Sequence, residues 1–166
     1  MKRLFVILGI ICCIPCIAQD ANYRRSISGE IFGLSAIGIS TQYGYLFKHS
    51  VHGFYDVRIG IGGWYYKDDA GISIPHAFTY NFKSKRHFIE VGIGSTFIKE
   101  YYLSTHTSAL KYFTGPMIGY KSISPKGLQF RIYANCFFNA NETQPIPFAG
   151  IGFGKVFRKK QINTAP

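Results

Sequence analysis

The chain has 166 residues, of which 47% are hydrophobic and 17% aromatic, and its formal net charge is +11. This length suits one domain, and the apolar content excludes a chain that is disordered throughout. A basic balance can indicate nucleic-acid binding. The first residues predict a secreted protein, however, and a secreted chain rarely meets nucleic acid.

The N-terminal segment has the pattern of a secretory signal peptide. Met1-Lys2-Arg3 is followed by the apolar run 4–17 and then by the small residue Ala18. A charged start, a short apolar run and a small residue at the exit are typical of a cleaved signal, so we predict cleavage after Ala18. A membrane-spanning helix is the alternative, but the run is short for a bilayer and contains Pro15.

Cysteine usage adds two exclusions. Cys12, Cys13 and Cys16 lie in the signal segment, so only Cys136 remains in the mature chain. One cysteine cannot form an intramolecular disulfide or a cysteine metal site, and its apolar strand context predicts an inert thiol. No later segment is a long apolar helix, so a membrane-inserted form would have to be a barrel.

Eight segments carry the period-two pattern of β-strands. They are, in chain order, 26–33, 36–47, 53–65, 72–82, 87–98, 112–121, 127–138 and 147–157. The third is the clearest. One of its faces has Tyr55, Val57, Ile59, Ile61 and Tyr65, and the other has Asp56, Arg58, Gly60, Gly62 and Trp64.

The glycines indicate which face looks inward. A water-facing side of a soluble sheet should be rich in Lys, Glu and Thr, and glycine weakens an exposed strand. Inside a narrow barrel, small residues leave room for large ones from other strands. The apolar faces are therefore predicted to meet lipid, with aromatic residues near the strand ends as interfacial girdles. His76, Pro116 and Lys155 fall on these apolar faces and fit the pattern poorly.

The connections alternate in kind. Those at 83–86 and 122–126 are compact turn sequences, whereas 66–71, 99–111 and 139–146 are longer and polar. Outer-membrane barrels have short periplasmic turns and longer outer loops, so we expect the longer segments to be reachable from outside the cell. The first loop, near Leu34 and Ser35, is unusually tight for the outer side.

Together these patterns predict an all-β chain, an eight-stranded antiparallel up-and-down transmembrane β-barrel over 19–157. The signal peptide 1–18 precedes it, and a basic C-terminal tail, 158–166, follows it. An even strand number places both chain ends on the periplasmic side.

The chain also resembles a family. The signal segment is followed by Ser28-Gly29-Glu30, Ile39-Ser40-Thr41-Gln42-Tyr43, Val57-Arg58-Ile59-Gly60-Ile61-Gly62, His87-Phe88-Ile89-Glu90-Val91-Gly92-Ile93-Gly94, Gly119-Tyr120-Lys121 and Phe148-Ala149-Gly150-Ile151-Gly152-Phe153-Gly154. This series is similar to the small outer-membrane β-barrel proteins of Bacteroidetes-type bacteria and covers nearly the whole mature chain. The resemblance implies the fold and an outer-membrane location, and it carries no established activity.

This topology sorts the charges by side. The periplasmic rim is predicted to hold Arg24, Arg25, Lys48, Lys83, Lys85, Arg86, Lys121, Lys126, Lys155, Arg158, Lys159 and Lys160 against Asp20. The outer loops hold Lys67, Lys99 and Lys111 against Asp68, Asp69, Glu100 and Glu142. The basic rim could contact an anionic lipid or another periplasmic polyanion, or its turns could simply sit beside lipid head groups.

Three motifs resemble parts of known functional sites. The glycine runs at 60–63 and 150–154 precede no helix, so they form no phosphate loop. His49 and His52 have no nearby carboxylate or third ligand, so no metal site is predicted. His106 and Ser108, with Glu100 upstream, resemble the His-x-Ser pair of barrel lipid A deacylases, but a loop lacks the rigidity that this chemistry needs.

The interior is predicted to contain a polar cluster of Glu30, Asp56, Arg58, Glu90 and Arg131. Buried charges have to be paired. Arg58 and Glu90 lie two strands apart across a strand of small inward residues, and Arg131 and Glu30 likewise flank Gly150, Gly152 and Gly154 after closure. We therefore predict the pairs Arg58–Glu90 and Arg131–Glu30, with Asp56 and Gln42 as secondary partners. The alternative is solvated side chains that never meet, because strand stagger could offset their levels.

These patterns predict a monomeric protein of the cell outer membrane, surrounded by outer-membrane lipid, with a structural or surface-interaction role. No catalysis, cofactor or metal is expected, because an eight-stranded barrel has room for little beyond its own side chains. Two alternatives stay open. One is a secreted soluble barrel that binds a small apolar ligand, as lipocalins do, and the other is a lipid A-modifying enzyme that uses His106 and Ser108.

Overall fold

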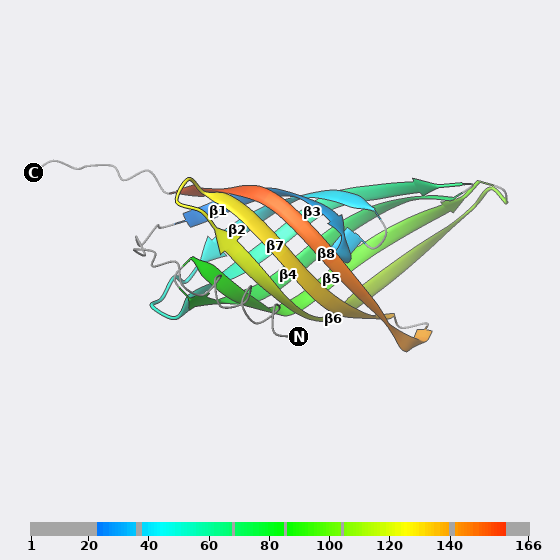
Figure 1. Ribbon diagram of the computed structural model, residues 1–166. Coiled ribbons are helices and arrows are strands. Elements are labelled where there is room, and N and C mark those ends of the chain that lie inside the picture. The colour runs from blue at the N-terminus through cyan, green and yellow to red at the C-terminus, as the bar shows by residue number, and fades with distance from the viewer. Residues whose placement is uncertain are drawn as a thin grey trace, which may run out of the picture.

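Eight antiparallel strands close into one barrel (Figure 1). The computed structural model describes residues 23–35, 38–67, 69–84, 86–103, 105–139 and 142–158. The strands are β1 (Tyr23–Phe32), β2 (Ile39–Phe47), β3 (Gly53–Tyr66), β4 (Asp69–Ser84), β5 (His87–Tyr102), β6 (Thr107–Ile123), β7 (Leu128–Asn139) and β8 (Glu142–Arg158). Each strand pairs with the next, and β8 returns to pair with β1. The predicted all-β, eight-stranded up-and-down barrel is confirmed. The predicted signal peptide and residues 159–166 of the predicted tail lie outside the described residues.

Several strands are longer, and their connections shorter, than predicted. The segment 99–111, expected as a loop, is mostly strand, because β5 continues to Tyr102 and β6 begins at Thr107. Likewise β8 begins at Glu142 within the expected loop 139–146. Polar residues alternate poorly with apolar ones here, so the sequence gives no period-two signal. Cross-strand pairs such as Glu100 with Ala109 nevertheless satisfy the backbone of both strands.

The two ends of the barrel differ. We call the end with the β2–β3, β4–β5 and β6–β7 connections the turn end, and the opposite end the loop end. At the loop end β3, β4, β5 and β6 reach beyond their neighbours, since the pairing of β2 with β3 stops at Gly63 and that of β6 with β7 starts at Phe113. Figure 1 shows the β5–β6 hairpin projecting past the other strands. These extra residues, 64–66, 69–71, 100–102 and 107–112, are called the projecting sheet below.

Side chains alternate between the lumen and the outer surface. In β2 buried and exposed residues alternate almost perfectly, with Gln42 buried and Tyr43 exposed. The exposed side is apolar along most strands, as Ile59 in β3 and Ile93 in β5 illustrate. The strands bury charged side chains instead, namely Glu30, Asp56, Arg58, Glu90, Lys121 and Arg131. The barrel is therefore inverted relative to a soluble protein.

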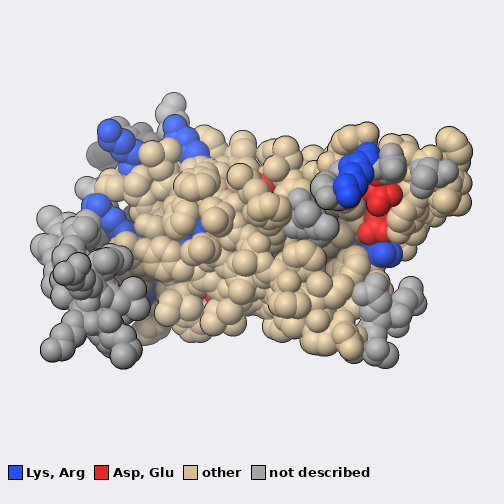
Figure 2. Space-filling view, turned by 45° about the vertical axis from the view of Figure 1, so that its right-hand side comes forward, with Lys and Arg blue, Asp and Glu red and all other residues tan. Residues whose placement is uncertain are grey.

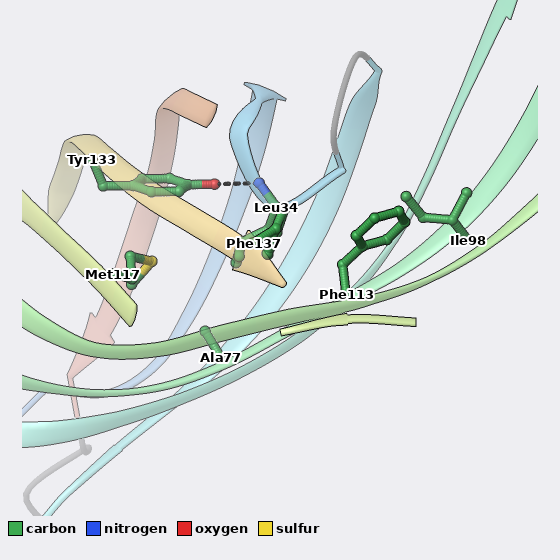
Figure 3. Close-up of a cluster of buried hydrophobic side chains, with 7 residues drawn as sticks. All are labelled: Leu34, Ala77, Ile98, Phe113, Met117, Tyr133 and Phe137. Carbon is green, nitrogen blue, oxygen red and sulfur yellow. Dashed lines mark hydrogen bonds between the residues drawn. The ribbon is translucent and has the colours of Figure 1, made fainter. Parts of the chain in front are cut away.

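The lumen is filled in three layers. An apolar layer closes the turn end and consists of Leu46, Phe54, Phe88, Ile123 and Val156. A second apolar layer closes the loop end and consists of Leu34, Ala77, Ile98, Phe113, Met117, Tyr133 and Phe137 (Figure 3). Polar and charged side chains lie between them. Along β6, for example, Ile123, Lys121 and Met117 belong to successive layers.

The tight first loop contributes to the loop-end layer. It forms a 3-10 turn, η1 (Gly33–Ser35), whose three residues are all buried. The backbone N–H of Leu34 donates to the Tyr133 hydroxyl at 2.8 Å, so the loop is held to β7 across the lumen (Figure 3). Gly33 has φ +75°, and a Cβ there would lie 2.2 Å from the Tyr133 hydroxyl oxygen. Only glycine allows this approach.

Aromatic residues gather near both ends of the outer surface. Near the turn end the rings of Tyr55 and Tyr80 lie 4.9 Å apart, centroid to centroid. Nearer the loop end the His76 ring lies 5.6 Å from Phe97 and 5.9 Å from Tyr112, and these two rings lie 4.5 Å from each other, centroid to centroid. His76, which fitted the apolar face poorly, is thus one ring of an aromatic group. Among the described residues, no helix has the length and apolar character to cross a membrane.

Candidate functional site

The most distinctive chemical feature of the barrel is a buried network of charges. In β3, Arg58 donates through Nη1 to Glu90 Oε1 of β5, and the same nitrogen lies 3.3 Å from Asp56 Oδ2. The side chains of all three residues are at most 1% exposed. β4 lies between β3 and β5, and its Thr79 hydroxyl donates to Glu90 Oε1 at 2.9 Å. The structure thus joins the first predicted pair, with Asp56 as its secondary partner.

Lys121 is a further member of this network that the sequence analysis placed wrongly. It was expected on the periplasmic rim, yet its side chain is 0% exposed. Its Nζ lies 2.6 Å from Asp56 Oδ2 and 3.8 Å from Glu90 Oε2. The alternation of β6 contained the signal, because Tyr120 faces outward and the next residue must face inward. Lys121 was predicted on the rim because it lies near the end of its strand.

A second buried pair joins β7 to β1 across β8, at the closure of the barrel. Arg131 Nη2 of β7 donates to Glu30 Oε2 of β1 at 2.6 Å and to Gln42 Oε1 of β2 at 3.2 Å. This is the second predicted pair with its predicted secondary partner. Tyr133, which the sequence analysis did not single out, adds a hydrogen bond from its hydroxyl to Glu30 Oε1. Leu34 N also donates to that carboxylate oxygen, at 3.1 Å.

Small residues make room for these contacts. A Cβ on Gly44 would lie 2.3 Å from Ser26 Oγ and 3.2 Å from Asp56 Oδ1, so a larger residue in β2 would displace the network. In β8, Gly152 faces the Arg131 guanidinium, with 3.5 Å from its Cβ position to Nη2. The predicted glycine path between Arg131 and Glu30 is thus present, mainly through Gly152.

The formal charges in the lumen balance. Glu30, Asp56 and Glu90 face Arg58, Lys121 and Arg131, and all six are buried. Burying a charge costs several kcal/mol unless it is paired, so these contacts reduce the free energy that the charged layer costs the folded state. They also tie β1, β3, β5, β6 and β7 across the lumen, between strands far apart in sequence. The arrangement can cross-link the barrel, and among the described residues buried apolar side chains occupy the lumen on both sides of it.

The proposed His-Ser-Glu constellation is not assembled. Glu100 accepts a hydrogen bond from the Tyr102 hydroxyl at 2.6 Å and forms an ion pair with Lys111 at 3.1 Å. His106 is exposed in the β5–β6 turn with φ +52°. In the described part of the chain no hydrogen bond joins His106 to Ser108 or to Glu100. A serine nucleophile would need both contacts.

The remaining motifs form no metal centre and no phosphate loop within the described residues. Across the described ranges no three His, Cys, Asp or Glu side chains lie close enough to hold a metal ion. The glycine runs at 60–63 and 150–154 lie within β3 and β8, and neither leads into a helix. The residues of both runs are part of the barrel wall.

Fold and interior together define a closed eight-stranded up-and-down β-barrel with an apolar outer surface and a charged, filled lumen. A sequence comparison finds no matching family model and no matching curated protein. A comparison of structures finds a similar fold in the crystal structure of Ail, the attachment invasion locus protein of Yersinia pestis, with a TM-score of 0.59. The match covers 85% of this chain and all of that chain at 9% sequence identity, so it supports the fold alone.

Proposed function

We propose that this chain is an outer-membrane β-barrel protein with a structural or surface-interaction role and no catalytic activity. The inverted barrel carries this proposal. Every strand exposes isoleucine, valine or phenylalanine side chains, and six charged side chains are buried among the described residues. Such a surface is costly in water and stable in lipid, where a closed barrel also satisfies every backbone group.

The distribution of charge on the outside supports a membrane location. Figure 2 shows Lys and Arg at both ends of the molecule, Asp and Glu at the loop end, and a broad middle zone with only traces of charged residues. The strands have 9 to 17 residues, and about 9–11 tilted residues cross a bilayer. The aromatic groups near both ends suit the interfaces.

The interior supports the exclusion of three other roles. A general porin needs a water-filled lumen, but here apolar layers close both ends. A lipocalin-like carrier needs an apolar cavity and a polar outer surface, and this barrel has the opposite arrangement. The lipid A-modifying enzyme would need His106 and Ser108 in contact, and their turn does not supply that geometry.

A surface-interaction role is supported by the projecting sheet. Its four strands extend past the apolar outer belt and expose Tyr65 and Leu110. In this sheet residues 107–112 of β6 pair with β5, and the described pairing of β6 with β7 begins at Phe113. Apolar side chains exposed beyond the membrane are surfaces at which other molecules can bind. The similar fold belongs to a protein named an attachment invasion locus protein, which fits such a role.

Gel migration after detergent extraction tests the membrane barrel. We expect the protein to resist extraction with salt or carbonate, to dissolve in detergent, and to migrate faster unboiled than boiled, because a closed barrel stays compact in the detergent sample. The mature N-terminus, read by mass spectrometry, should follow Ala18. Recovery of the folded protein in the soluble periplasmic fraction would refute the proposed location.

A further inference from the structure

Two basic side chains lie side by side on the apolar outer surface near the turn end. Arg25 of β1 and Lys155 of β8 are both exposed, while Ser26 and Val156 next to them are buried, so both cations point away from the lumen. The register pairs Arg25 with Phe157 and Ile27 with Lys155. The two cations are therefore diagonal neighbours across the closure of the barrel, about 7–8 Å apart at Cα.

A third cation lies beside them in the β6–β7 turn. Lys126 is exposed there, and Leu128, two residues further on, pairs with Lys155. The turn is held against β8 by a hydrogen bond from Val156 N to Gly127 O at 2.7 Å. Three cations therefore come from three elements, β1, β8 and the β6–β7 turn.

This cluster has no acidic neighbour among the described residues. Glu30, Asp56 and Glu90 are buried in the lumen, and Asp69 and Glu100 lie at the loop end. Asp20 lies outside the described residues. The flanking side chains are instead apolar and exposed: Ile27, Tyr45, Leu128, Phe153 and Phe157. Like charges this close, among apolar side chains, are stabilised by a bound anion.

We propose that Arg25, Lys126 and Lys155 form a binding site for one anionic phospholipid of the leaflet at the turn end. The cations hold the phosphate, and the acyl chains lie along Ile27 and Leu128. The inference rests on the proposed membrane location.

The position on the outer surface selects lipid over a soluble polyanion. Long basic side chains beside apolar surface extend toward the head-group level, where they meet phosphate, while their stems stay in the hydrocarbon. A nucleic acid or free polyanion could neutralise the charges but would leave Ile27 and Leu128 uncovered. Figure 2 shows that Lys and Arg also gather more widely at the turn end, so the test has to separate a local site from this general charge.

Native mass spectrometry of the detergent-solubilised protein, titrated with phosphatidylglycerol, tests the site. The test variant is Arg25→Gln/Lys155→Gln. The matched control is Lys48→Gln/Arg86→Gln, which removes the same charge from the same end but at other turns. Each cation near a membrane surface contributes enough for about a fivefold change, so we expect the test variant to bind the first lipid about 10- to 30-fold more weakly. The control substitutions should change the affinity for the first phosphatidylglycerol less than threefold. Phosphatidylcholine should bind the unmodified protein and both variants equally.

The outcomes separate this inference from the proposed function. Insertion into phosphatidylcholine vesicles and heat-modifiable migration report on the membrane barrel alone, and failure of both would refute the proposed function. If the protein inserts but the affinity for phosphatidylglycerol falls equally in both variants, the charge acts diffusely and the site is refuted. Displacement of the lipid by inorganic phosphate at constant ionic strength would also refute it, because a free anion would then suffice.

Discussion

Single residues of the lumen differ in how many strands they hold together. Lys121 contacts Asp56 of β3 at 2.6 Å and Glu90 of β5 at 3.8 Å, so one side chain joins three strands. It also lies over the Phe54 ring of the turn-end layer, with 5.6 Å from Nζ to the ring centroid. Lys121 therefore connects the charged layer to the apolar layer beneath it.

We expect Lys121→Met to lower the free energy of unfolding by about 3–5 kcal/mol, because it leaves one negative charge of the lumen uncompensated. Urea unfolding in lipid vesicles can follow the fluorescence of Trp64, the single tryptophan of the chain. Lys48→Met, at an exposed position of the β2–β3 turn, is the control and should change the stability by less than about 0.5 kcal/mol. Equal effects of the two substitutions would contradict the buried role of Lys121.

At the scale of elements, the strands are linked by charge pairs as well as by their ladders. The Arg58–Glu90 pair joins β3 to β5 across β4, where backbone pairing cannot. Arg58 Nε and Glu90 Oε2 have no hydrogen-bond partner within the described residues. The pair therefore recovers only part of what its burial costs.

The double variant Arg58→Met/Glu90→Leu should be much more stable than its single parents. Each single change leaves a buried charge without its main partner and should cost about 3–5 kcal/mol, whereas removing both charges can be nearly neutral. The measurement is a double-mutant cycle from urea unfolding. Purely additive losses would show that the two side chains do not interact.

The η1 turn is the second element with a measurable contribution. Leu34 is 0% exposed within the loop-end layer, so Leu34→Ala should lower the unfolding free energy by about 2–5 kcal/mol through the cavity it leaves. Leu103→Ala provides the control, because Leu103 is 46% exposed in the β5–β6 turn. A Leu34→Ala loss no larger than that of the control would mean that the first loop does not pack into the lumen in the membrane.

At the scale of the whole molecule, the barrel is closed at both ends and asymmetric along its axis. The apolar layers seal the lumen, so the protein reconstituted in planar bilayers should give no stepwise conductance at ±100 mV. Steady channel openings by the unmodified protein would contradict the layered interior. Outer-membrane extract lacking the protein is the blank for contaminating porins.

The asymmetry predicts which end faces the medium. An epitope inserted after Leu103, in the β5–β6 turn at the tip of the projecting sheet, should bind antibody on intact cells, because this polar hairpin cannot lie in hydrocarbon. An epitope inserted after Pro125, in the β6–β7 turn, should bind only after the outer membrane is broken. The reverse pattern would invert the assigned orientation.

The sequence by itself determined the strands, their faces and the buried charges. Side-chain alternation is a local property, so the inward position of Glu30, Asp56, Arg58, Glu90 and Arg131 could be predicted from parity. The small residues of the intervening strands also indicated which charges could reach each other. Lys121 followed the same parity, but its place near the strand end suggested the rim instead.

The tertiary structure alone decided the levels at which these side chains meet. Stagger between strands and closure of the barrel bring Lys121 to Asp56 and Tyr133 to Glu30, and no spacing within one strand specifies them. The inward fold of η1 has the same origin, because Leu34 N donates to Tyr133, which is distant in the chain, and only the closed barrel brings the two together. The extension of β5 and β6 into a predicted loop is decided instead by pairing between the two strands of one hairpin, which no side-chain alternation indicates.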